Sequence, residues 1–245
     1  MKNLLLLMLL MPWIALANPI DDRCPQFTAY GAPVGPDANT QYSCKQNYAL
    51  KYSNASKTAV YVVEHVTKES ITGPAKRKDD FRPDPTLAAG TSAQLADYAG
   101  KPYDRGHLAP GADNTQTESI MSESFLLSNM IPQVPNNNRG IWKQLEVQVR
   151  DYVLKNNDVY VVSGPIYNTV YETIGAGVGI PQRIFKVIVD VKNQRASAYI
   201  FPNTALPVAD LPKYKVTIRE AEQASGLNFN PKLPLNAALE TAKTW

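Results

Sequence analysis

The segment Tyr-Asp-Arg-Gly-His-Leu-Ala-Pro, at residues 103–110, brings together ionisable side chains that are candidates for catalysis. An acid, two bases and a glycine follow one another in it, a combination that is costly to bury. His107 is also one of only two histidines among 245 residues. Histidine changes its charge near neutral pH, so His107 is the leading candidate for a general base. We expect it to be exposed on a loop, where Gly106 lets the backbone approach a ligand.

Asn138 and Glu146 come later in the chain, at the start of a predicted helix. An apolar stripe at helical spacing indicates this helix and falls at Trp142, Leu145, Val149 and Val153. Asn138 is placed at the N-cap or just before it. On a regular helix Asn138 and Glu146 would lie about 80° apart around the axis and about two turns apart along it. One helix could therefore direct both side chains toward one cleft.

The oxygens of Asn138 and Glu146 are hard ligands, which suit Mg²⁺ better than zinc. With two histidines and two cysteines in the chain, a closed structural zinc site is nearly excluded. Arg105 offers a planar guanidinium whose geometry fits a phosphate. A base, an arginine and a magnesium-type site together indicate hydrolysis of a phosphate ester.

Four ordered blocks of sequence carry a resemblance to a known family. Asp104–His107 resembles its Asp-Arg-Gly-His signature, and Ser128–Gln133 resembles a later Ser/Thr-Asn-hydrophobic-x-Pro-Gln segment. Asn138–Glu146 resembles its Asn-x-Gly-x-Trp-x-x-Leu-Glu helix, and Val161–Tyr167 resembles a strand that ends in Gly-Pro. The family is the DNA/RNA non-specific endonucleases, the ββα-metal nucleases of Serratia type and endonuclease G type. The similarity covers roughly residues 45–230.

The resemblance implies a role for each matching position. His107 resembles the general base that takes a proton from the attacking water. Asn138 resembles the one direct protein ligand of a Mg²⁺ ion, for which Mn²⁺ can substitute, and Glu146 resembles the acid that orients the waters of that ion. The expected substrates are DNA and RNA, and the expected products are fragments with 5′-phosphate ends.

Four further roles are expected near the site, and one of them has two candidate arginines. Asn129 resembles a residue that supports the site and the substrate phosphate, and Arg105 one that positions phosphate or orders the site. A further arginine of the family precedes an Asp-Pro pair and stabilises the pentavalent phosphorane. Arg77 is the better match for it, and Arg82 is the competitor because the spacing drifts in this loop. Asp104 is expected to anchor its loop by hydrogen bonds rather than to take part in catalysis.

Strands and helices are mixed without a βαβ rhythm, which favours an α+β fold with an antiparallel sheet. Strands are expected at 48–52, 58–66, 158–163, 183–190 and 196–201, with Gly164-Pro165 ending the third of them. A capping box at Thr217 opens a helix that stops at Gly226, and residues 69–102 are expected to form a long ordered loop over the site. His65 is predicted to be a packing or surface residue and Trp142 a core residue. Together with the resemblance, this predicts the ββα-metal nuclease fold, a central antiparallel sheet flanked by helices and long loops.

Residues 1–17 have the positive start, apolar run and small-x-small end of a secretory signal peptide. Export would place Cys24 and Cys44 in an oxidising compartment, where two cysteines indicate one disulfide. We therefore predict an N-terminal arm at 18–44, stapled by this bond, and an endonuclease domain at 45–245. The mature protein is expected to be periplasmic or secreted, with no membrane contact once the signal peptide is removed.

The formal net charge of +3 does not by itself indicate a nucleic-acid-binding protein. Two other functions remain open on the sequence: a catalytically inactive nucleic-acid-binding module, and a phosphodiesterase that acts on a small ligand or a wall polymer. An open groove lined by Arg77, Lys78, Arg105 and Arg139 would favour a polymer, and a closed pocket would favour a small ligand. A homodimer is compatible with the family resemblance.

Overall fold

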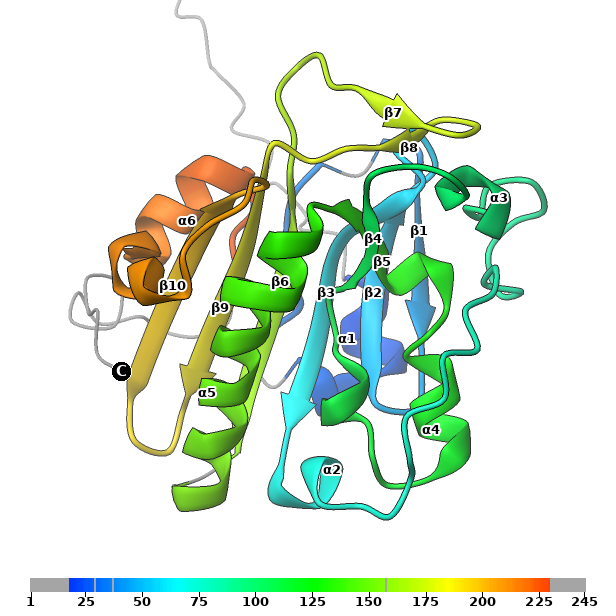
Figure 1. The fold of residues 1–245 in the computed structure, drawn as a ribbon. Coiled ribbons are helices and arrows are strands. Elements are labelled where there is room, and N and C mark those ends of the chain that lie inside the picture. Colours follow the sequence, from blue (N-terminus) through cyan, green and yellow to red (C-terminus); the bar gives the residue numbers. More distant parts are fainter. Residues whose placement is uncertain (1–17, 29, 37, 157, 230–245) are drawn as a thin grey trace, which may run out of the picture.

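Seven strands form one sheet through the centre of the structure, in the order β1-β2-β3-β6-β9-β10-β11 (Figure 1). All of its pairings are antiparallel. The structure is a computed structural model, and it describes residues 18–28, 30–36, 38–156 and 158–229. The predicted signal peptide at 1–17 lies outside the described residues.

The strands of this sheet are β1 (Thr40–Cys44), β2 (Tyr48–Ser53), β3 (Thr58–Val66), β6 (Val159–Ile166), β9 (Arg183–Asp190), β10 (Arg195–Pro202) and β11 (Lys215–Val216). Two smaller sheets pair β4 (Asp104–His107) with β5 (Met130–Gln133) and β7 (Thr173–Ile174) with β8 (Val178–Gly179). The α-helices are α1 (Pro19–Arg23), α2 (Lys68–Ile71), α3 (Leu95–Tyr98), α4 (Glu118–Glu123), α5 (Lys143–Lys155) and α6 (Ile218–Ser225). Short 3-10 turns are η1 (Pro25–Phe27), η2 (Gly111–Asp113), η3 (Leu127–Asn129) and η5 (Val208–Tyr214), and η4 (Asn137–Trp142) is a π-helical turn.

The central sheet is buried on both faces, and alternate residues of each strand enter different cores. On β9, Ile184 and Ile188 pack on the face covered by α5, whereas Phe185 and Val187 pack on the face covered by α1 and α6. This arrangement gives three layers, with α5 lying across one face of the sheet in Figure 1. It explains why the β9 sequence is an almost continuous apolar run. Lys186 interrupts that run on the α5 face.

The strands expected at 48–52 and 58–66, those expected at 183–190 and 196–201, and the predicted C-terminal helix are present, and each pair of strands forms a hairpin. β2 pairs with β3, and β9 pairs with β10. Thr217 forms the capping box of α6, and Gly226 ends it with a φ of 71°, a left-handed value that glycine adopts without strain. The predicted end of the strand after residue 163 is wrong, because β6 continues through Pro165 to Ile166. Beyond Ser163 this strand pairs with β9 but no longer with β3, and such an edge tolerates proline.

The predicted single helix from Asn138 to Glu146 is also not regular. Asn138 lies in the π-helical turn η4, and Gly140 departs from helical geometry with φ −105° and ψ −106° before α5 begins at Lys143. A π-helical turn changes the angular position of every residue before it. The spacing of about 80° deduced for an ideal helix therefore does not apply here.

The predicted loop that carries His107 is a strand. Asp104, Arg105, Gly106 and His107 form β4 and pair with Gln133, Pro132, Ile131 and Met130 of β5. Two of the sequence blocks that carry the family resemblance thus form one small antiparallel sheet. The segment 69–102 that precedes it is mostly irregular, with α2 overlapping its start and α3 near its end.

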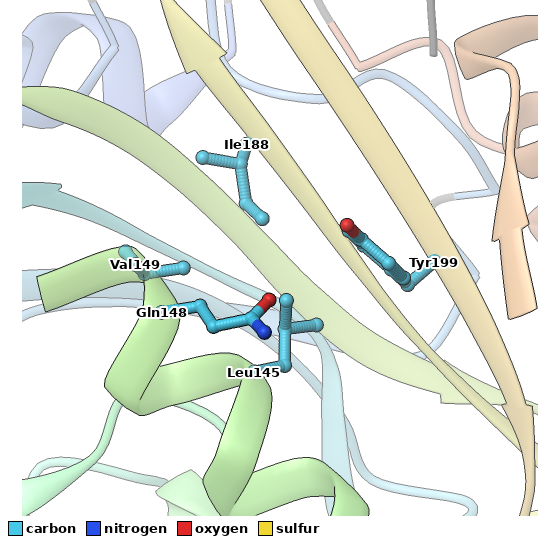
Figure 2. A pocket seen from close by; sticks show the side chains of 5 residues that line it. All are labelled: Leu145, Gln148, Val149, Ile188 and Tyr199. Atoms are coloured by element: carbon cyan, nitrogen blue, oxygen red, sulfur yellow. The ribbon is translucent and has the colours of Figure 1, made fainter. Parts of the chain in front are cut away.

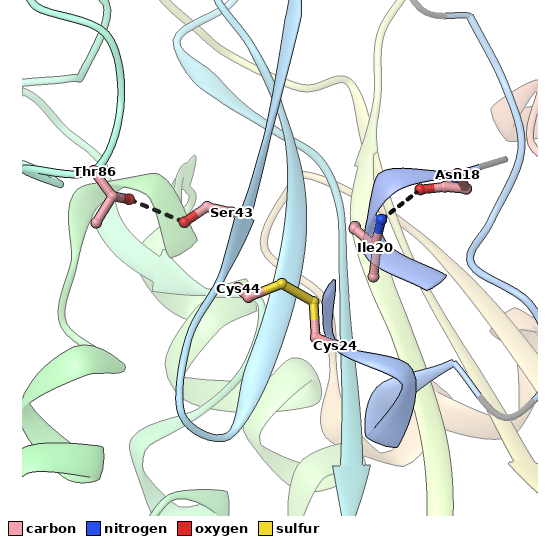
Figure 3. The surroundings of a disulfide bond; sticks show 6 residues. All are labelled: Asn18, Ile20, Cys24, Ser43, Cys44 and Thr86. Atoms are coloured by element: carbon pink, nitrogen blue, oxygen red, sulfur yellow. Dashed lines mark hydrogen bonds between the residues drawn. A yellow bond between two sulfur atoms is a disulfide. The ribbon is translucent and has the colours of Figure 1, made fainter. Parts of the chain in front are cut away.

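Residues 18–44, predicted to be an N-terminal arm, contribute α1, η1 and the edge strand β1. Cys24 and Cys44 form the predicted disulfide, with their Cα atoms 6.1 Å apart (Figure 3). The bond joins the end of α1 to the last residue of β1. Next to it, the hydroxyls of Ser43 and Thr86 are hydrogen-bonded at 2.9 Å and connect β1 to the long segment before β4.

A small hollow of about 40 Å³ separates α5 from the sheet, with Leu145, Gln148 and Val149 facing Ile188 and Tyr199 (Figure 2). No charged residue lines it, so we do not regard it as a site for a phosphate ester. In the portion of the chain that the structure covers, no helix is both long and apolar enough to cross a membrane.

Replacing both cysteines with serine should lower the free energy of unfolding by about 3 kcal/mol, because the unfolded chain regains the freedom of a loop of 20 residues. Urea unfolding of the oxidised protein and of the Cys24→Ser/Cys44→Ser variant measures the difference. Adding a reductant should weaken the parent protein and leave the double variant unchanged. Equal stability of the two oxidised proteins would contradict the prediction.

Candidate active site

A cleft of about 570 Å³ lies between β4, the segment that precedes it and the start of α5. Its lining consists of Arg77, Phe81, Asp104, Arg105, His107, Pro110, Gly111, Ala112, Asn138, Arg139, Lys143, Glu146 and Arg150. Five of these side chains are cationic and two are carboxylates, so the cleft favours an anion. Five of the six predicted site residues line it, and the exception is Asn129.

His107 sits in an aromatic pocket at the end of β4. Its ring lies 4.9 Å from that of Phe125 and 5.7 Å from that of Phe81, and the residue is only 8% exposed. Burial lowers the pKa of His107 to about 3, with the positive charges of Arg77 and Arg105 adding to the effect. The imidazole is therefore neutral at neutral pH. Its Nε2 is buried without a hydrogen-bond partner among the described residues, which leaves this atom available for a substrate or water.

Gly106 is required for packing rather than for approach to a ligand. A Cβ at this position would lie 2.0 Å from Oε1 and 2.7 Å from Cβ of Gln133, on the paired strand β5. Gln133 is fully buried and donates to Oδ1 of Asn137, whose own amide donates to the carbonyls of Pro202 and Thr204. The glycine thus makes room for a side chain that connects β5 to the turn carrying Asn138.

Asn129 is completely buried and does not reach the cleft. Its Oδ1 accepts from the amide of Ala109 at 2.9 Å, and its Nδ2 donates to the carbonyls of Ala109 and Ser124. The side chain is fully used in holding the chain that follows His107. Asn129 can therefore support the site through the main chain, and its predicted support of the substrate phosphate would be indirect.

Asp104 fixes the orientation of Asn138. Nδ2 of Asn138 donates to Asp104 at 2.8 Å, and Arg139 binds both oxygens of the same carboxylate. Partial burial raises the pKa of Asp104, but the bonds from Arg139 and Asn138 outweigh it and leave this pKa below its usual value. With its amide nitrogen engaged, Asn138 is left with Oδ1 as the atom able to bind a cation.

Glu146 is half-buried, and no other described residue hydrogen-bonds to its carboxylate. Burial raises its pKa to about 7, opposed mainly by the charge of Lys186 and further by Arg150 and Arg77. A carboxylate that the chain leaves uncompensated at the edge of a cleft can accept hydrogen bonds from bound water or lie near a cation. These properties agree with the predicted role of orienting metal-bound waters.

The structure distinguishes between the two candidate arginines. Arg77 lines the cleft, pairs with Asp79 and lies 4.9 Å from the ring of Phe125. Arg82 instead donates to Asp80 and to the carbonyl of Ser122, and it does not line the cleft. We therefore keep Arg77 as the arginine in position to contact a phosphate.

Arg105 is held over Phe81, with its guanidinium carbon 4.1 Å from the centre of the ring. This stacking fixes the side chain while leaving its N–H groups free to face a ligand. Phe81 itself was missed by the sequence reasoning, because its place in an irregular segment gives no periodic signal.

Arg150 is a second cleft residue that the sequence reasoning missed. It lies four residues after Glu146, hence on the same face of α5, and this spacing could have revealed it. Its guanidinium is held by Asp113 at 2.8 Å.

Lys78 was considered together with Arg77, Arg105 and Arg139 as the lining of an open groove. The other three residues line the cleft, but Lys78 does not.

The two remaining expectations concern structural residues. Trp142 is 1% exposed and donates its indole N–H to the carbonyl of His107 at 3.1 Å, so it is a core residue as predicted. The ring of His65 stacks on Tyr160 at 4.3 Å and forms a short contact with Asp158, away from the cleft. His65 is a packing residue, as predicted.

The donor set fits a single hard cation better than a soft one. Within the described ranges, no cluster of three or more His, Cys, Asp or Glu side chains could hold a metal ion. Asn138 offers an amide oxygen and Glu146 a carboxylate without a hydrogen-bonded partner, and a magnesium ion that keeps several waters needs few protein ligands. These residues are compatible with the predicted Mg²⁺ site.

The comparison with known families gives one clear result. A sequence model described as DNA/RNA non-specific endonuclease matches residues 25–236. This chain belongs to that family. The match confirms the resemblance carried by the four sequence blocks, and it extends into the region predicted to be an N-terminal arm.

Several curated proteins resemble this DNA/RNA non-specific endonuclease family member along most of its length. Mitochondrial nuclease EXOG of Xenopus laevis is 36% identical over 86% of this chain and 63% of its own. Nuclease C1 of Cunninghamella echinulata is 34% identical over 78% of this chain and 83% of its own. Human mitochondrial endonuclease G is 32% identical over 85% and 74%. The chain thus spans about three fifths of the length of the EXOG proteins it matches.

A crystal structure of EndoG in complex with EndoGI has the same fold, with a TM-score of 0.77 and 29% identity over 85% of this chain and 91% of that one. The predicted fold class, α+β with a central antiparallel sheet of the ββα-metal nuclease type, is confirmed.

Replacing Gly106 with alanine should destabilise the protein by about 1–3 kcal/mol, because the new methyl group would overlap the buried side chain of Gln133. Urea unfolding measures this. Gly111→Ala is the comparison, since its Cβ would lie 3.2 Å from the flexible Met121 side chain and should cost less. A Gly106→Ala variant as stable as the parent would show that Gln133 can move aside.

The raised pKa of Glu146 predicts a pH-dependent effect of Glu146→Gln. Its folded-state pKa of about 7 lies above the usual glutamate value of 4.5, so its stabilising contribution is complete below 4.5 and is lost as pH rises through 7. In metal-free buffer the Gln variant should be more stable than the parent at pH 8, on the order of 2 kcal/mol, and equal to it near pH 4. Chemical unfolding at both pH values tests this, and an unchanged difference would contradict it.

Proposed function

We propose that this protein is a divalent-metal-dependent endonuclease that hydrolyses the phosphodiester bonds of DNA and RNA without sequence preference. The observation that carries the proposal is the meeting of three features in one cleft: the neutral, buried His107, the oxygen donors Asn138 and Glu146, and five cationic side chains. The names of the relatives, EXOG, nuclease C1 and endonuclease G, support it.

In this proposal His107 is the general base. Its Nε2 takes a proton from water while the water oxygen bonds to phosphorus and the bond from phosphorus to the 3′-oxygen breaks. The 3′-oxygen leaves with the electron pair of that bond and takes a proton from a second water molecule, and His107 releases its proton to solvent. The products are a 5′-phosphate and a 3′-hydroxyl. A pKa of about 3 makes a weak base, but Arg77 and Arg105 contribute to that low value. A phosphate bound to these two arginines would offset their charge and raise the basicity of His107 when substrate is present.

The arginines bind and orient the phosphate. Arg105, fixed over Phe81, and Arg77, at the mouth of the pocket of His107, present N–H groups to non-bridging oxygens. Their charge stabilises the additional negative charge that develops at phosphorus in the transition state. Arg77 therefore takes the role predicted for the phosphorane-stabilising arginine.

Asn138 would hold the metal ion through Oδ1, and Glu146 would orient its waters. When bound, a Mg²⁺ ion, or Mn²⁺ in its place, supplies positive charge to the phosphate and the leaving oxygen. Asp104 keeps the amide of Asn138 in the orientation that this requires. The chain can therefore use one metal ion, because His107 activates the water.

A polymeric substrate is favoured over a small one by the rim of the cleft. The side chains of Arg77 and Arg139 are 58% and 72% exposed, so the cationic lining continues to the surface. A closed pocket for a small ligand would bury such groups. Retention of the base and of both oxygen donors argues against an inactive binding module.

Export to the periplasm or the medium remains a proposal, supported by the leader-like residues 1–17 and by the disulfide. The EXOG and endonuclease G relatives are named as mitochondrial proteins, so the family does not decide the location. N-terminal sequencing of the mature protein would test cleavage before Asn18. A homodimer also stays a prediction, to be tested by light scattering.

The direct test is digestion of plasmid DNA and of RNA by the purified protein, with Mg²⁺ and with EDTA. The parent should cleave both polymers only with metal, and His107→Ala should lower the rate at least ~100-fold, because a general base typically contributes that much. His65→Ala is the matched control, since it removes the other histidine. Cleavage by His107→Ala at the parental rate would refute the proposed base.

A further inference from the structure

Lys186 is a buried cation that the proposed mechanism does not use. It lies on β9, the strand after β6 in the central sheet, and is 1% exposed. No carboxylate of the described residues lies within ion-pair distance of its ammonium group. Burying a charge without a direct counter-ion is expensive, and an apolar residue of similar size would be the more stable choice. The cost indicates that this lysine serves something other than stability.

The contacts of Lys186 lead to the chain that follows His107. Its Nζ donates to Oγ of Ser163 at 2.8 Å, on the neighbouring strand, and to the carbonyl of Leu108 at 3.4 Å. The same ammonium lies 4.7 Å from the ring of Trp142, whose indole N–H donates to the carbonyl of His107. Two successive carbonyls therefore accept hydrogen bonds from different elements. The carbonyl of His107 is bound by Trp142 of η4, and that of Leu108 by Lys186 of the central sheet.

The main chain after His107 is therefore fixed from two sides. Asn129 binds it through the amide and carbonyl of Ala109, while Trp142 and Lys186 bind the two preceding carbonyls. Lys186 is the only one of these groups that brings a charge. Because Lys186 is a residue of β9 and also binds Ser163 of β6, it connects this segment to two strands of the central sheet.

The charged groups around Lys186 come from three elements. Glu64 lies on β3, Asp113 on η2, and Glu146 and Arg150 on α5. Burial raises the pKa of each of the three carboxyl groups, and the charge of Lys186 opposes that rise. For Glu146, Lys186 is the strongest of the cations that oppose protonation. This charge lies on the protein side of the cleft, where substrate and solvent do not neutralise it.

We propose that Lys186 is a positioning residue for the reaction at this site: it fixes the main chain that carries His107, and its positive charge acts on Glu146. The proposal rests on the proposed function, since it assigns the base and the water-orienting acid to these two residues. Lys186 touches neither substrate nor metal in it. It acts through His107 and Glu146.

Lys186→Met removes the charge and the donor while keeping the length of the side chain. Lys51→Met is the matched control, because Lys51 is also 1% exposed in the same sheet but lies beside Tyr42, which packs on the opposite face. Two quantities are measured: kcat and KM on plasmid DNA with Mg²⁺, and the ring resonances of isotope-labelled histidine in the metal-free proteins. With two histidines in the chain, the signals of His107 and His65 can be assigned by single substitution.

Lys186→Met should lower kcat by about tenfold or more, since small displacements of a base are costly, and change KM by less than about twofold. Its His107 resonances should shift, and those of His65 should not. Lys51→Met should leave kcat and both sets of resonances unchanged. A parental kcat or unshifted His107 resonances in Lys186→Met, or an equal loss of kcat in Lys51→Met, would overturn the proposal.

Lys186→Gln retains an N–H donor and removes the charge. It takes the place of the Met variant in the same comparison if the Met variant does not fold. We expect a reduced kcat with His107 resonances close to those of the parent, and a parental kcat would overturn the electrostatic part. If the parent protein cleaves neither DNA nor RNA, the proposed function fails. The histidine resonances would still decide whether Lys186 positions His107.

Discussion

The neutral imidazole of His107, enclosed by aromatic rings at the end of a short strand, is the constraint around which the rest of the cleft is arranged. A histidine in such a place loses its proton, because burial and two neighbouring arginines both disfavour the charged form. It also has to be held there by the backbone, since its Nε2 has no partner among the described residues. Asn129, Trp142 and the pairing of β4 with β5 provide that support.

Charge is divided between the two sides of this cleft. Arginines at the front, Arg77 and Arg105 among them, are exposed or stacked on aromatic rings and can receive a phosphate. Behind it, Glu64 and Asp113 are buried together with Lys186. Burial raises the pKa of both carboxyl groups and of Glu146, and the charges of Lys186 and Arg150 oppose that rise. A bound substrate can neutralise the arginines at the front, but it does not reach Lys186, which is 1% exposed and does not line the cleft. An anion bound by the arginines would therefore leave unchanged the charge of Lys186, which opposes the protonation of Glu146.

Much of the architecture could be predicted because it follows from local sequence. The hairpins at β2–β3 and β9–β10 and the capping box of α6 depend on residues close together in the chain. Errors arose where a distant partner decides the conformation. The segment of His107 was expected to be an exposed loop, yet pairing with β5 makes it a buried strand. Gly106 was explained by approach to a ligand, although a side chain on the other strand requires it.

The sequence by itself determined which chemistry is available: one histidine with a suitable context, hard oxygen donors, arginines for phosphate and a pair of cysteines. It also determined the family, because ordered blocks of residues do not depend on knowing their contacts. Only the tertiary structure decided that Asn129 supports the chain instead of lining the cleft, that Arg77 and not Arg82 faces it, and that Lys186 lies behind it. These distinctions depend on burial and on contacts between residues far apart in the chain, and neither is encoded in the spacing of residue types.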